Sequence, residues 1–427
     1  MFGVTAAGNV YDVSSAGAVG AAATTFTNGR IQFENVTTAA GNYLYCCNGV
    51  DKPQHYNGTV WANPAITNVT DTTLFQPLTF KSRLFFAQTA SLSLWYLPVN
   101  SIAGAATELP LGGIFRNGGY VAAIASWTLD AGRGVDDHLV IVTNKGEVAV
   151  YAGTDPTSAT SWSLVGVYQI GAPVGRNCLC KYGGDLLIIC LDGVYPLSAA
   201  LQSTRIDSSQ AITDKIRTAI SEVTGTYGSN YGWSLTAYPD KNALLLNVPT
   251  SSTTAQQYVM NGITGAWAKF TGWNGFSFIL YNNDLYFGAK GKVYRAWSGN
   301  ADSGLNILAD AKPAFNHFGI RGRKKAFHMV KPYIASSSVT SAAIVLNVDF
   351  SDEVPSGTPS ASTSSFGVWD TSTWDGATWG GDLQVSKKWR QVHGIGYCAT
   401  LRIRIATNTS EVRWYSTDFM VSAGGIL

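Results

Sequence analysis

The stretch Asp137–Gly153, DHLVIVTNKGEVAVYAG, has the pattern of two strands joined by a tight turn. Leu139–Val142 is continuously apolar, which is typical of a strand covered on both faces. The turn contains Asn144 and Gly146, and these residue types accept the positive φ angles that hairpin turns require. Val148–Tyr151 then returns as the second strand. The stretch therefore predicts a β-hairpin whose first strand is buried.

Similar hairpins recur along the first 305 residues. Clear copies run over Leu84–Leu97, Gly183–Leu197 and Asn283–Trp297, and weaker copies lie between them and at the start of the chain. One apolar residue of each first strand serves as an anchor: Val4, Leu44, Leu84, Leu139, Leu186, Leu244 and Leu285. Anchors that recur every 40–58 residues in a strand-rich chain are typical of β-propeller blades, in which neighbouring sheets cover each other. The alternative is a set of unrelated hairpins in a sandwich.

One segment, residues 206–223, interrupts this pattern. Its apolar residues Ile212, Ile216, Ala219, Ile220 and Val223 share one face at helical spacing. We therefore predict a β-propeller-like domain over residues 1–305, with about seven blade-like hairpins and one short amphipathic helix inserted at 206–223. The helix would pack across blades or reach a neighbouring subunit.

The sequence changes character after Trp297. Leu401–Ile405 alternates apolar and basic residues, which is typical of a half-exposed strand. This predicts a β-sandwich-like domain over residues 306–427 and an all-β protein. A loop at 355–381, rich in Gly, Ser and Thr, carries Trp369, Trp374 and Trp379. A loop of that length is usually functional or ordered by a partner, so these three residues are predicted to form an exposed interaction site.

Charge is scarce and unevenly placed. Charged residues make up 13% of the chain, about half the usual ~25%, which suggests that much of the surface is covered by partner chains. The net charge of +2 excludes general nucleic-acid binding through a global basic excess. One cluster stands out, however: Arg321, Arg323, Lys324 and Lys325. It predicts contact with a phosphate backbone or an acidic partner, and the alternative is a solvated connector between domains.

Residues with catalytic or metal-binding potential are dispersed. The six cysteines lack zinc-site spacing, so we predict free thiols and folding in a reducing cytosol. The five histidines form no metal-binding pair, and the aspartates of the repeats lie at turns and strand starts. Ser372–Trp379, STWDGATW, approaches the Asp box of sialidase propellers but has Trp374 in place of the aspartate. We predict no enzyme activity, no cofactor and no metal. The chain also lacks the pattern of a signal peptide or a membrane span.

Three stretches together carry a family resemblance. Asp136–Ser198 combines a hairpin, a Thr-Asp-Pro loop, the segment IGAPVGRNCL and the segment GGDLLIICLDGVYPLS. Asn283–Trp297 and the closing Leu401–Val421 add to it, so that a third to a half of the chain is covered. The chain resembles the tail nozzle, or tail hub, proteins of short-tailed bacteriophages, which are also called packaged-DNA stabilisation proteins.

This resemblance implies a structural virion protein, assembled in the host cytoplasm as a homohexamer. Such a ring lies at the distal tail below the head-to-tail adaptor, bears tail fibres or spikes, and retains the genomic double-stranded DNA in its lumen until ejection. Arg321–Lys325 would then contact the adaptor or an adjacent subunit. The chain departs from expectation in starting inside a blade-like hairpin. Either a C-terminal strand completes that blade, or residues upstream are missing from this sequence.

Two other functions remain open from the residues. A carbohydrate-binding or glycan-cleaving propeller could use Trp369, Trp374 and Trp379 as stacking platforms. A generic propeller scaffold in a bacterial cytosol would use the same blades only to bind other proteins.

Overall fold

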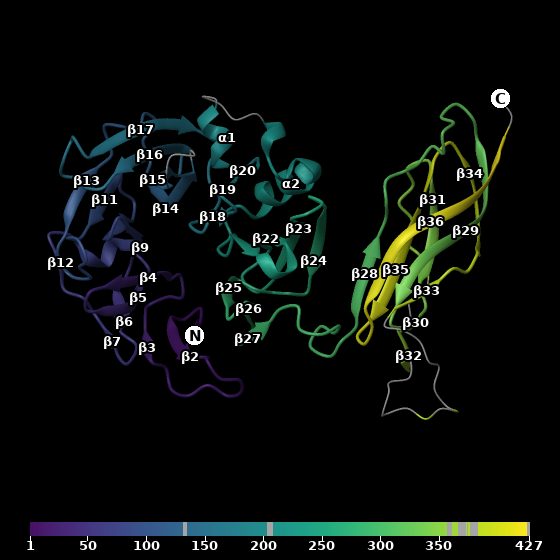
Figure 1. The fold of residues 1–427 in the computed structure, drawn as a ribbon, viewed down its shortest axis with the longest axis horizontal. Coiled ribbons are helices and arrows are strands. Elements are labelled where there is room, and N and C mark those ends of the chain that lie inside the picture. Colours follow the sequence, from purple (N-terminus) through teal and green to yellow (C-terminus); the bar gives the residue numbers. More distant parts are fainter. Residues whose placement is uncertain are drawn as a thin grey trace. The chain divides into compact units, whose positions relative to one another are not determined.

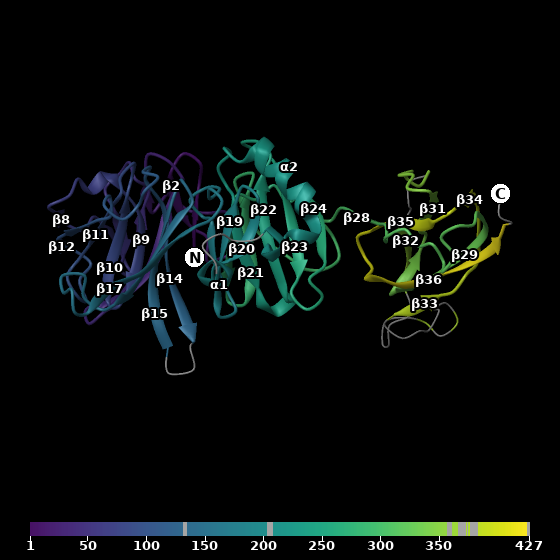
Figure 2. The same cartoon turned by 90° about the horizontal axis from the view of Figure 1, so that it is seen from above.

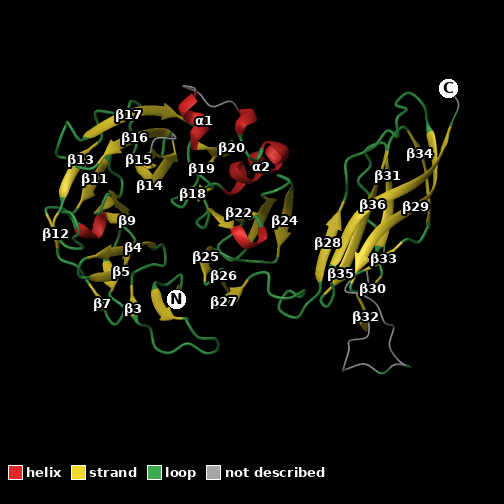
Figure 3. Ribbon diagram, viewed as in Figure 1, coloured by secondary structure: helices red, strands yellow, loops and turns green. Residues whose placement is uncertain are grey.

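The computed structural model describes residues 1–130, 135–202, 208–356, 361–365, 373, 375 and 383–424. Strands dominate it, as Figure 3 shows. The chain divides into two compact units, Met1–Ala296 and Trp297–Leu427, and each is described by itself. The predicted domain boundary between residues 305 and 306 lies inside the second unit, ahead of its first strand.

In its described part, the first unit contains seven small antiparallel sheets that follow one another along the chain and surround a common centre (Figures 1 and 2). The strands, sheet by sheet, are β1 (Phe2–Val4), β2 (Asn9–Asp12) and β3 (Thr24–Thr25); β4 (Gln32–Thr38), β5 (Gly41–Cys47), β6 (Gln54–Tyr56) and β7 (Trp61–Ala62); β9 (Leu74–Phe80), β10 (Arg83–Gln88), β11 (Ser93–Tyr96) and β13 (Thr107–Pro110); β14 (Val121–Asp130), β15 (Val135–Thr143), β16 (Glu147–Gly153) and β17 (Trp162–Gln169); β18 (Leu179–Tyr182), β19 (Asp185–Cys190) and β20 (Gly193–Pro196); β21 (Ser234–Tyr238), β22 (Ala243–Pro249), β23 (Ala255–Asn261) and β24 (Trp267–Thr271); β25 (Ser277–Tyr281), β26 (Asp284–Ala289) and β27 (Lys292–Arg295). In addition to these seven sheets, β8 (Ile66–Thr67) pairs in parallel with β12 (Gly104–Ala105). Each predicted anchor lies in a different one of the seven sheets, and the all-β, propeller-like fold is confirmed.

The hairpin formed by β15 and β16 shows how neighbouring sheets pack against each other. β15 pairs with β16, and the apolar run of β15 is fully buried. Leu139 and Ile141 pack into a core shared with β9, β10 and β11 of the preceding sheet. Val140 and Val142 point to the opposite face and pack against β19 of the following sheet. A strand covered on both faces needs no polar side, which is why this run is continuously apolar.

The first and last sheets of this unit meet through side chains. A Cβ atom placed on Gly3 of β1 would lie 3.6 Å from the Cγ2 atom of Val293 on β27. Among the described residues, no hydrogen-bonded strand pair joins the two sheets. The ring of sheets is therefore closed at this point by packing alone.

The predicted helix begins later than expected. The prediction was a helix over residues 206–223, of which 206 and 207 lie outside the described residues. The structure has helix α2 at Arg217–Tyr227. Two short 3-10 turns, η2 (Ser208–Gln210) and η3 (Asp214–Ile216), precede it. The early start was wrong because this segment is bound to β20: the backbone N–H of Ile212 donates to the Val194 carbonyl oxygen at 3.0 Å, and the Thr213 Oγ1 atom accepts from the Val194 N–H at 3.1 Å. Ile220 and Val223 are buried between sheets, so α2 packs across blades.

The remaining helical segments are short. They are α1 (Leu197–Gln202) and the 3-10 turns η1 (Asp71–Thr73) and η4 (Pro239–Lys241). Within the described ranges, no helix has the length and apolar character needed to cross a membrane.

The second unit is a two-sheet β-sandwich. Its strands are β28 (Ile307–Ala311), β29 (Lys325–Ser336), β30 (Ser338–Thr340), β31 (Ala343–Val348), β32 (Ala361–Ser365), β33 (Gln384–Ser386), β34 (Arg390–Gly396), β35 (Ala399–Thr407) and β36 (Val412–Ala423). One sheet of the sandwich has the strand order β28-β35-β31. In the other sheet, β29 pairs with β33, β34 and β36. Outside these two sheets, β30 and β32 form a pair of their own. Phe327 and Val330 of β29 pack against Leu401 and Ile403 of β35 to form the core.

Candidate functional site

The predicted basic cluster lies in the loop before β29 and at the first residue of that strand. Arg321, Arg323 and Lys324 are exposed, but Lys325 is only 2% exposed. The Lys325 ammonium group donates hydrogen bonds to three backbone carbonyl oxygens: that of Ile320, that of Arg323 at 3.0 Å and that of Tyr397 at 2.9 Å. Lys325 is therefore a structural residue that ties the loop to the β34–β35 turn, and it offers no charge to a partner.

The other three basic residues form a surface that we call the basic patch: Arg321, Arg323 and Lys324. Among the described residues, no carboxylate pairs with any of them. The Lys324 Nζ atom lies 5.9 Å from the centre of the Tyr397 ring, and this ring is itself exposed. Ile395, opposite Ala326 in the strand register, is exposed as well. The patch therefore combines unpaired positive charge with apolar surface.

A second group of charges in this unit, on β28, β35 and the adjoining segments, is paired internally. The Arg402 guanidinium binds both carboxylate oxygens of Asp310, each at 2.8 Å, and one oxygen of Asp352 at 3.1 Å. Lys312 pairs with the same Asp352 oxygen at 2.6 Å. The hydrogen bond from Arg402 holds the pKa of Asp310 below its usual value. Arg404 lies 3.5 Å from Asp310 as well, so three basic side chains share these two carboxylates and hold this part of the sandwich together.

The three tryptophans predicted as an exposed interaction site, Trp369, Trp374 and Trp379, lie outside the described residues. A glycan-cleaving propeller would need a pair of carboxylates, and several aspartates of the repeats instead have structural partners. Asp137 accepts hydrogen bonds from Thr128 at 2.8 Å and Lys81 at 3.1 Å.

Two further aspartates bind neighbouring segments in the same way. Asp284 pairs with Arg295 at 2.7 Å, and Asp185 accepts a hydrogen bond from the backbone N–H of Ser198 at 3.1 Å. No group of three or more His, Cys, Asp or Glu side chains suited to a metal ion occurs in the part of the chain that the structure describes.

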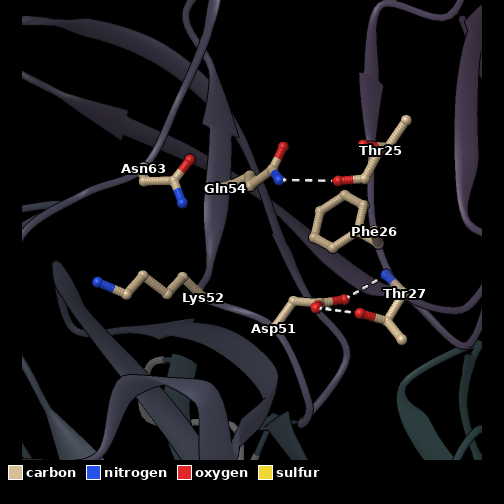
Figure 4. A pocket seen from close by; sticks show the side chains of 7 residues that line it. All are labelled: Thr25, Phe26, Thr27, Asp51, Lys52, Gln54 and Asn63. Atoms are coloured by element: carbon tan, nitrogen blue, oxygen red, sulfur yellow. Dashed lines mark hydrogen bonds between the residues drawn. The ribbon is translucent and has the colours of Figure 1, made fainter.

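A hollow of about 390 Å³ lies where the first sheet meets the second (Figure 4). Its lining comprises Thr25, Phe26, Thr27, Asp51, Lys52, Gln54 and Asn63. Burial alone would raise the pKa of Asp51, but hydrogen bonds from Thr27 and Asn48 outweigh it and lower that pKa. The Gln54 side chain donates to the Thr25 carbonyl oxygen at 3.2 Å. The polar groups named above form hydrogen bonds with one another, so the hollow lies at a contact between two sheets. No sequence pattern predicts it.

Exposed apolar residues gather on one strand of the first unit. Among the described residues, β17 pairs only with β16, and it lies at the rim of the unit (Figure 1). Leu164, Val165 and Val167 of this strand are 42%, 48% and 38% exposed. A register shift between Val150 and Tyr151 leaves Val165 without a cross-strand partner, which is the mark of a β-bulge. β17 therefore presents an apolar edge.

The second unit presents two further edge strands. β36 is 12 residues long and, among the described residues, pairs only with β29. Its Tyr415 and Met420 side chains are exposed. All five residues of β28 are exposed, including Ile307 and Leu308, and this strand pairs only with β35 in the same part of the chain.

Comparison with known proteins does not assign the chain to a family. No protein-family model matches the chain, and no curated protein is similar to it. Among solved structures, BamB from Moraxella catarrhalis is 13% identical, with 76% of this chain and 91% of that chain covered and a TM-score of 0.36. The computationally designed Ika8 protein is 10% identical, with 68% and 78% covered and a TM-score of 0.39. The SapL1 lectin in complex with alpha methyl fucoside is 10% identical, with 62% and 95% covered and a TM-score of 0.32.

Proposed function

We propose that the chain is a structural virion protein that forms a ring at the distal tail of a short-tailed bacteriophage. The ring provides and closes the channel for the genomic double-stranded DNA and anchors other tail parts. The resemblance of Asp136–Ser198, Asn283–Trp297 and Leu401–Val421 to tail nozzle proteins supports the proposal, and it implies six copies. No catalytic step is assigned.

The observation that carries this proposal is the apolar edge of β17. An edge strand presents unpaired backbone N–H and C=O groups, and monomeric proteins usually protect such edges with charged residues or prolines. β17 instead exposes Leu164, Val165 and Val167. Clustered apolar surface of this kind marks an interface. A second copy of the chain would cover it.

A closed ring needs two different surfaces on each subunit. When the contact runs head to tail, one surface of a subunit meets another surface of its neighbour, and the ring closes if the rotation between copies fits. β17 lies in the first unit, whereas the edges of β28 and β36 lie in the second. Each subunit therefore has separate edges with which to contact two neighbours.

The basic patch has a distinct role in this proposal. Arg321, Arg323 and Lys324 contact an acidic surface of the head-to-tail adaptor or of an adjacent subunit, and the exposed Tyr397 ring contributes apolar area. Lys325, which the sequence placed in the same cluster, is left out because it is buried.

The test is the state of assembly of the purified full chain. Mass photometry and negative-stain electron microscopy are expected to show closed rings of six. Leu164→Lys combined with Val167→Lys places charge on β17 and is expected to reduce the ring fraction by at least about tenfold, since burying a lysine at each contact is costly. Val60→Lys, at an exposed valine outside the strands, is the matched control.

Two results would contradict the proposal. One is a monomer at every concentration tested, with circular dichroism showing a folded chain. The other is specific binding on a glycan array by that monomer, which would favour a carbohydrate-binding propeller instead.

A further inference from the structure

Three loops from three different sheets meet at a small pocket in the first unit. Arg30 lies just before β4, Arg176 before β18 and Tyr231 before β21. The pocket has a volume of about 30 Å³, and its other lining residues are Gln32, Gly175, Asn177, Gly232 and Trp233. Gln32 and Trp233 are buried and form its inner part, whereas both arginines are exposed to solvent at its mouth.

The two arginines bring positive charge to this pocket without a counter-charge. The Arg176 guanidinium lies 4.3 Å from the centre of the Phe75 ring, and that of Arg30 lies 5.1 Å from the centre of the Tyr231 ring. Within the described residues, neither side chain has an ion pair with a carboxylate. Partial loss of hydration lowers the pKa of Arg176, and the charge of Arg30 lowers it further. A bound anion would relieve this repulsion.

Gln32 supplies a second, independent sign of a ligand. Its side chain is only 9% exposed, and its Oε1 atom is buried without a hydrogen-bond partner among the described residues. Its Nε2 atom donates to the Oδ1 atom of Asn177 at 3.2 Å. The two ends of an amide have nearly the same shape, so both amides can turn over together. Their mutual hydrogen bond is then reversed, and Gln32, which lines the pocket, has an unpaired NH₂ donor in place of its unpaired oxygen.

We propose that this pocket binds a single carboxylate group. The planar fork of an arginine matches the two oxygens of a carboxylate, and charge-assisted hydrogen bonds of this kind are the strongest that side chains form. A space of about 30 Å³ holds roughly two water molecules, which suits two carboxylate oxygens and excludes a sugar ring. The carboxylate comes from a small free acid or from an Asp or Glu side chain of another protein. The pocket is independent of ring formation.

The first experiment measures the thermal unfolding of the full chain in sodium acetate, sodium phosphate or sodium chloride at equal ionic strength and pH. Acetate is expected to raise the melting temperature in a saturable way, beyond phosphate and chloride. Arg30→Gln is expected to weaken the apparent affinity about tenfold or more, the effect of losing one charge-assisted hydrogen bond. Arg116→Gln, at an exposed arginine outside the pocket in the same unit, is the matched control and is expected to bind as the parent does.

A second variant and a second probe complete the test. Arg176→Gln is expected to weaken binding as well, and its circular dichroism spectrum shows whether the fold is kept. A capped peptide with one Glu, compared with its Gln counterpart, separates the two sources of the carboxylate. Tighter binding of the Glu peptide than of acetate indicates a protein side chain, and equal or weaker binding indicates a free acid. The proposal is overturned by no saturable response to either carboxylate, by a response that Arg30→Gln leaves unchanged, or by binding of phosphate alone.

Discussion

Lys325 secures the loop that precedes β29, because its ammonium group donates hydrogen bonds to backbone carbonyl groups of Ile320, Arg323 and Tyr397. An ammonium group has three N–H bonds, so all of its donors are used. The sequence shows only a run of basic residues there, and nothing in the run marks which of them points inward. That depends on the β34–β35 turn, which lies some 70 residues further along the chain.

Replacing this lysine tests its structural role. Lys325→Met keeps the volume but leaves three carbonyl groups without their donor, and each unpaired buried group costs about 1–3 kcal/mol. We expect the free energy of unfolding of the second unit to fall by about 3 kcal/mol or more in urea titrations. Lys324→Met, at the exposed neighbour, is the control and is expected to change it by about 0.5 kcal/mol or less. Equal effects would contradict the assignment.

The cysteines give a pH dependence whose direction follows from their burial. Burial raises the pKa of Cys46 and of Cys178 to about 12, and that of Cys180 to about 11, from an ordinary value of 9.0. The folded chain therefore keeps neutral thiols where the unfolded chain already forms thiolates. This contribution to stability is fully present below pH 9 and is lost as the pH rises toward 12.

We therefore expect the free energy of unfolding to decline between pH 9 and pH 11. Cys178→Ala is expected to make the decline shallower, because it removes one raised pKa. At pH 8 a thiol reagent is expected to react slowly with the native chain and fully after unfolding in guanidinium. Fast labelling of the buried thiols in the native chain would contradict this reading.

At the scale of elements, the hairpin β15–β16 illustrates what could be predicted and why. Its apolar run and its turn residues are local signals, and they correctly indicated a strand covered on both faces. The start of helix α2 could not be predicted, because the Thr213 contact with Val194 is made between segments that the helical pattern does not link. The pocket of Arg30 and Arg176 was also invisible, since these residues are neighbours only after the sheets close around their centre.

A test is offered by two turn glycines: Gly146 in this hairpin and Gly183 between β18 and β19. Gly146 has a φ of +80°, and a Cβ atom there would lie 2.4 Å from the Ile170 carbonyl oxygen. Gly146→Ala therefore combines left-handed strain with a backbone clash, and we expect a loss of about 3 kcal/mol. Gly183, with a φ of +61° and open space around it, is the matched control. Gly183→Ala is expected to cost only about 1–2 kcal/mol. Thermal unfolding of the two variants would reveal the difference.

At the scale of the whole molecule, the two units have separate cores. In the described part of the chain, the apolar clusters of residues 1–296 contain no residue of the sandwich, and the sandwich core is built from residues of the second unit. Each unit therefore has a hydrophobic core of its own, which is what independent folding requires.

We expect the fragments 1–296 and 297–427 to fold separately. Each should give a strand-type circular dichroism spectrum and a cooperative melt, and the two melts should reproduce the transitions of the full chain in calorimetry. If neither fragment melts cooperatively, the two units depend on each other for stability.

The junction between β1 and β27 gives the ring of sheets a mechanical property. Every sheet is held internally by backbone hydrogen bonds, and the sheets that follow one another along the chain are also linked by the chain itself, whereas β1 and β27 lie in the first and last sheets and meet through the contact of Gly3 with Val293. A tangential load on the domain would separate these two sheets before it peeled any strand from its partner. Widening of the domain under strain is thereby expected to begin at this junction, which no chain connection bridges.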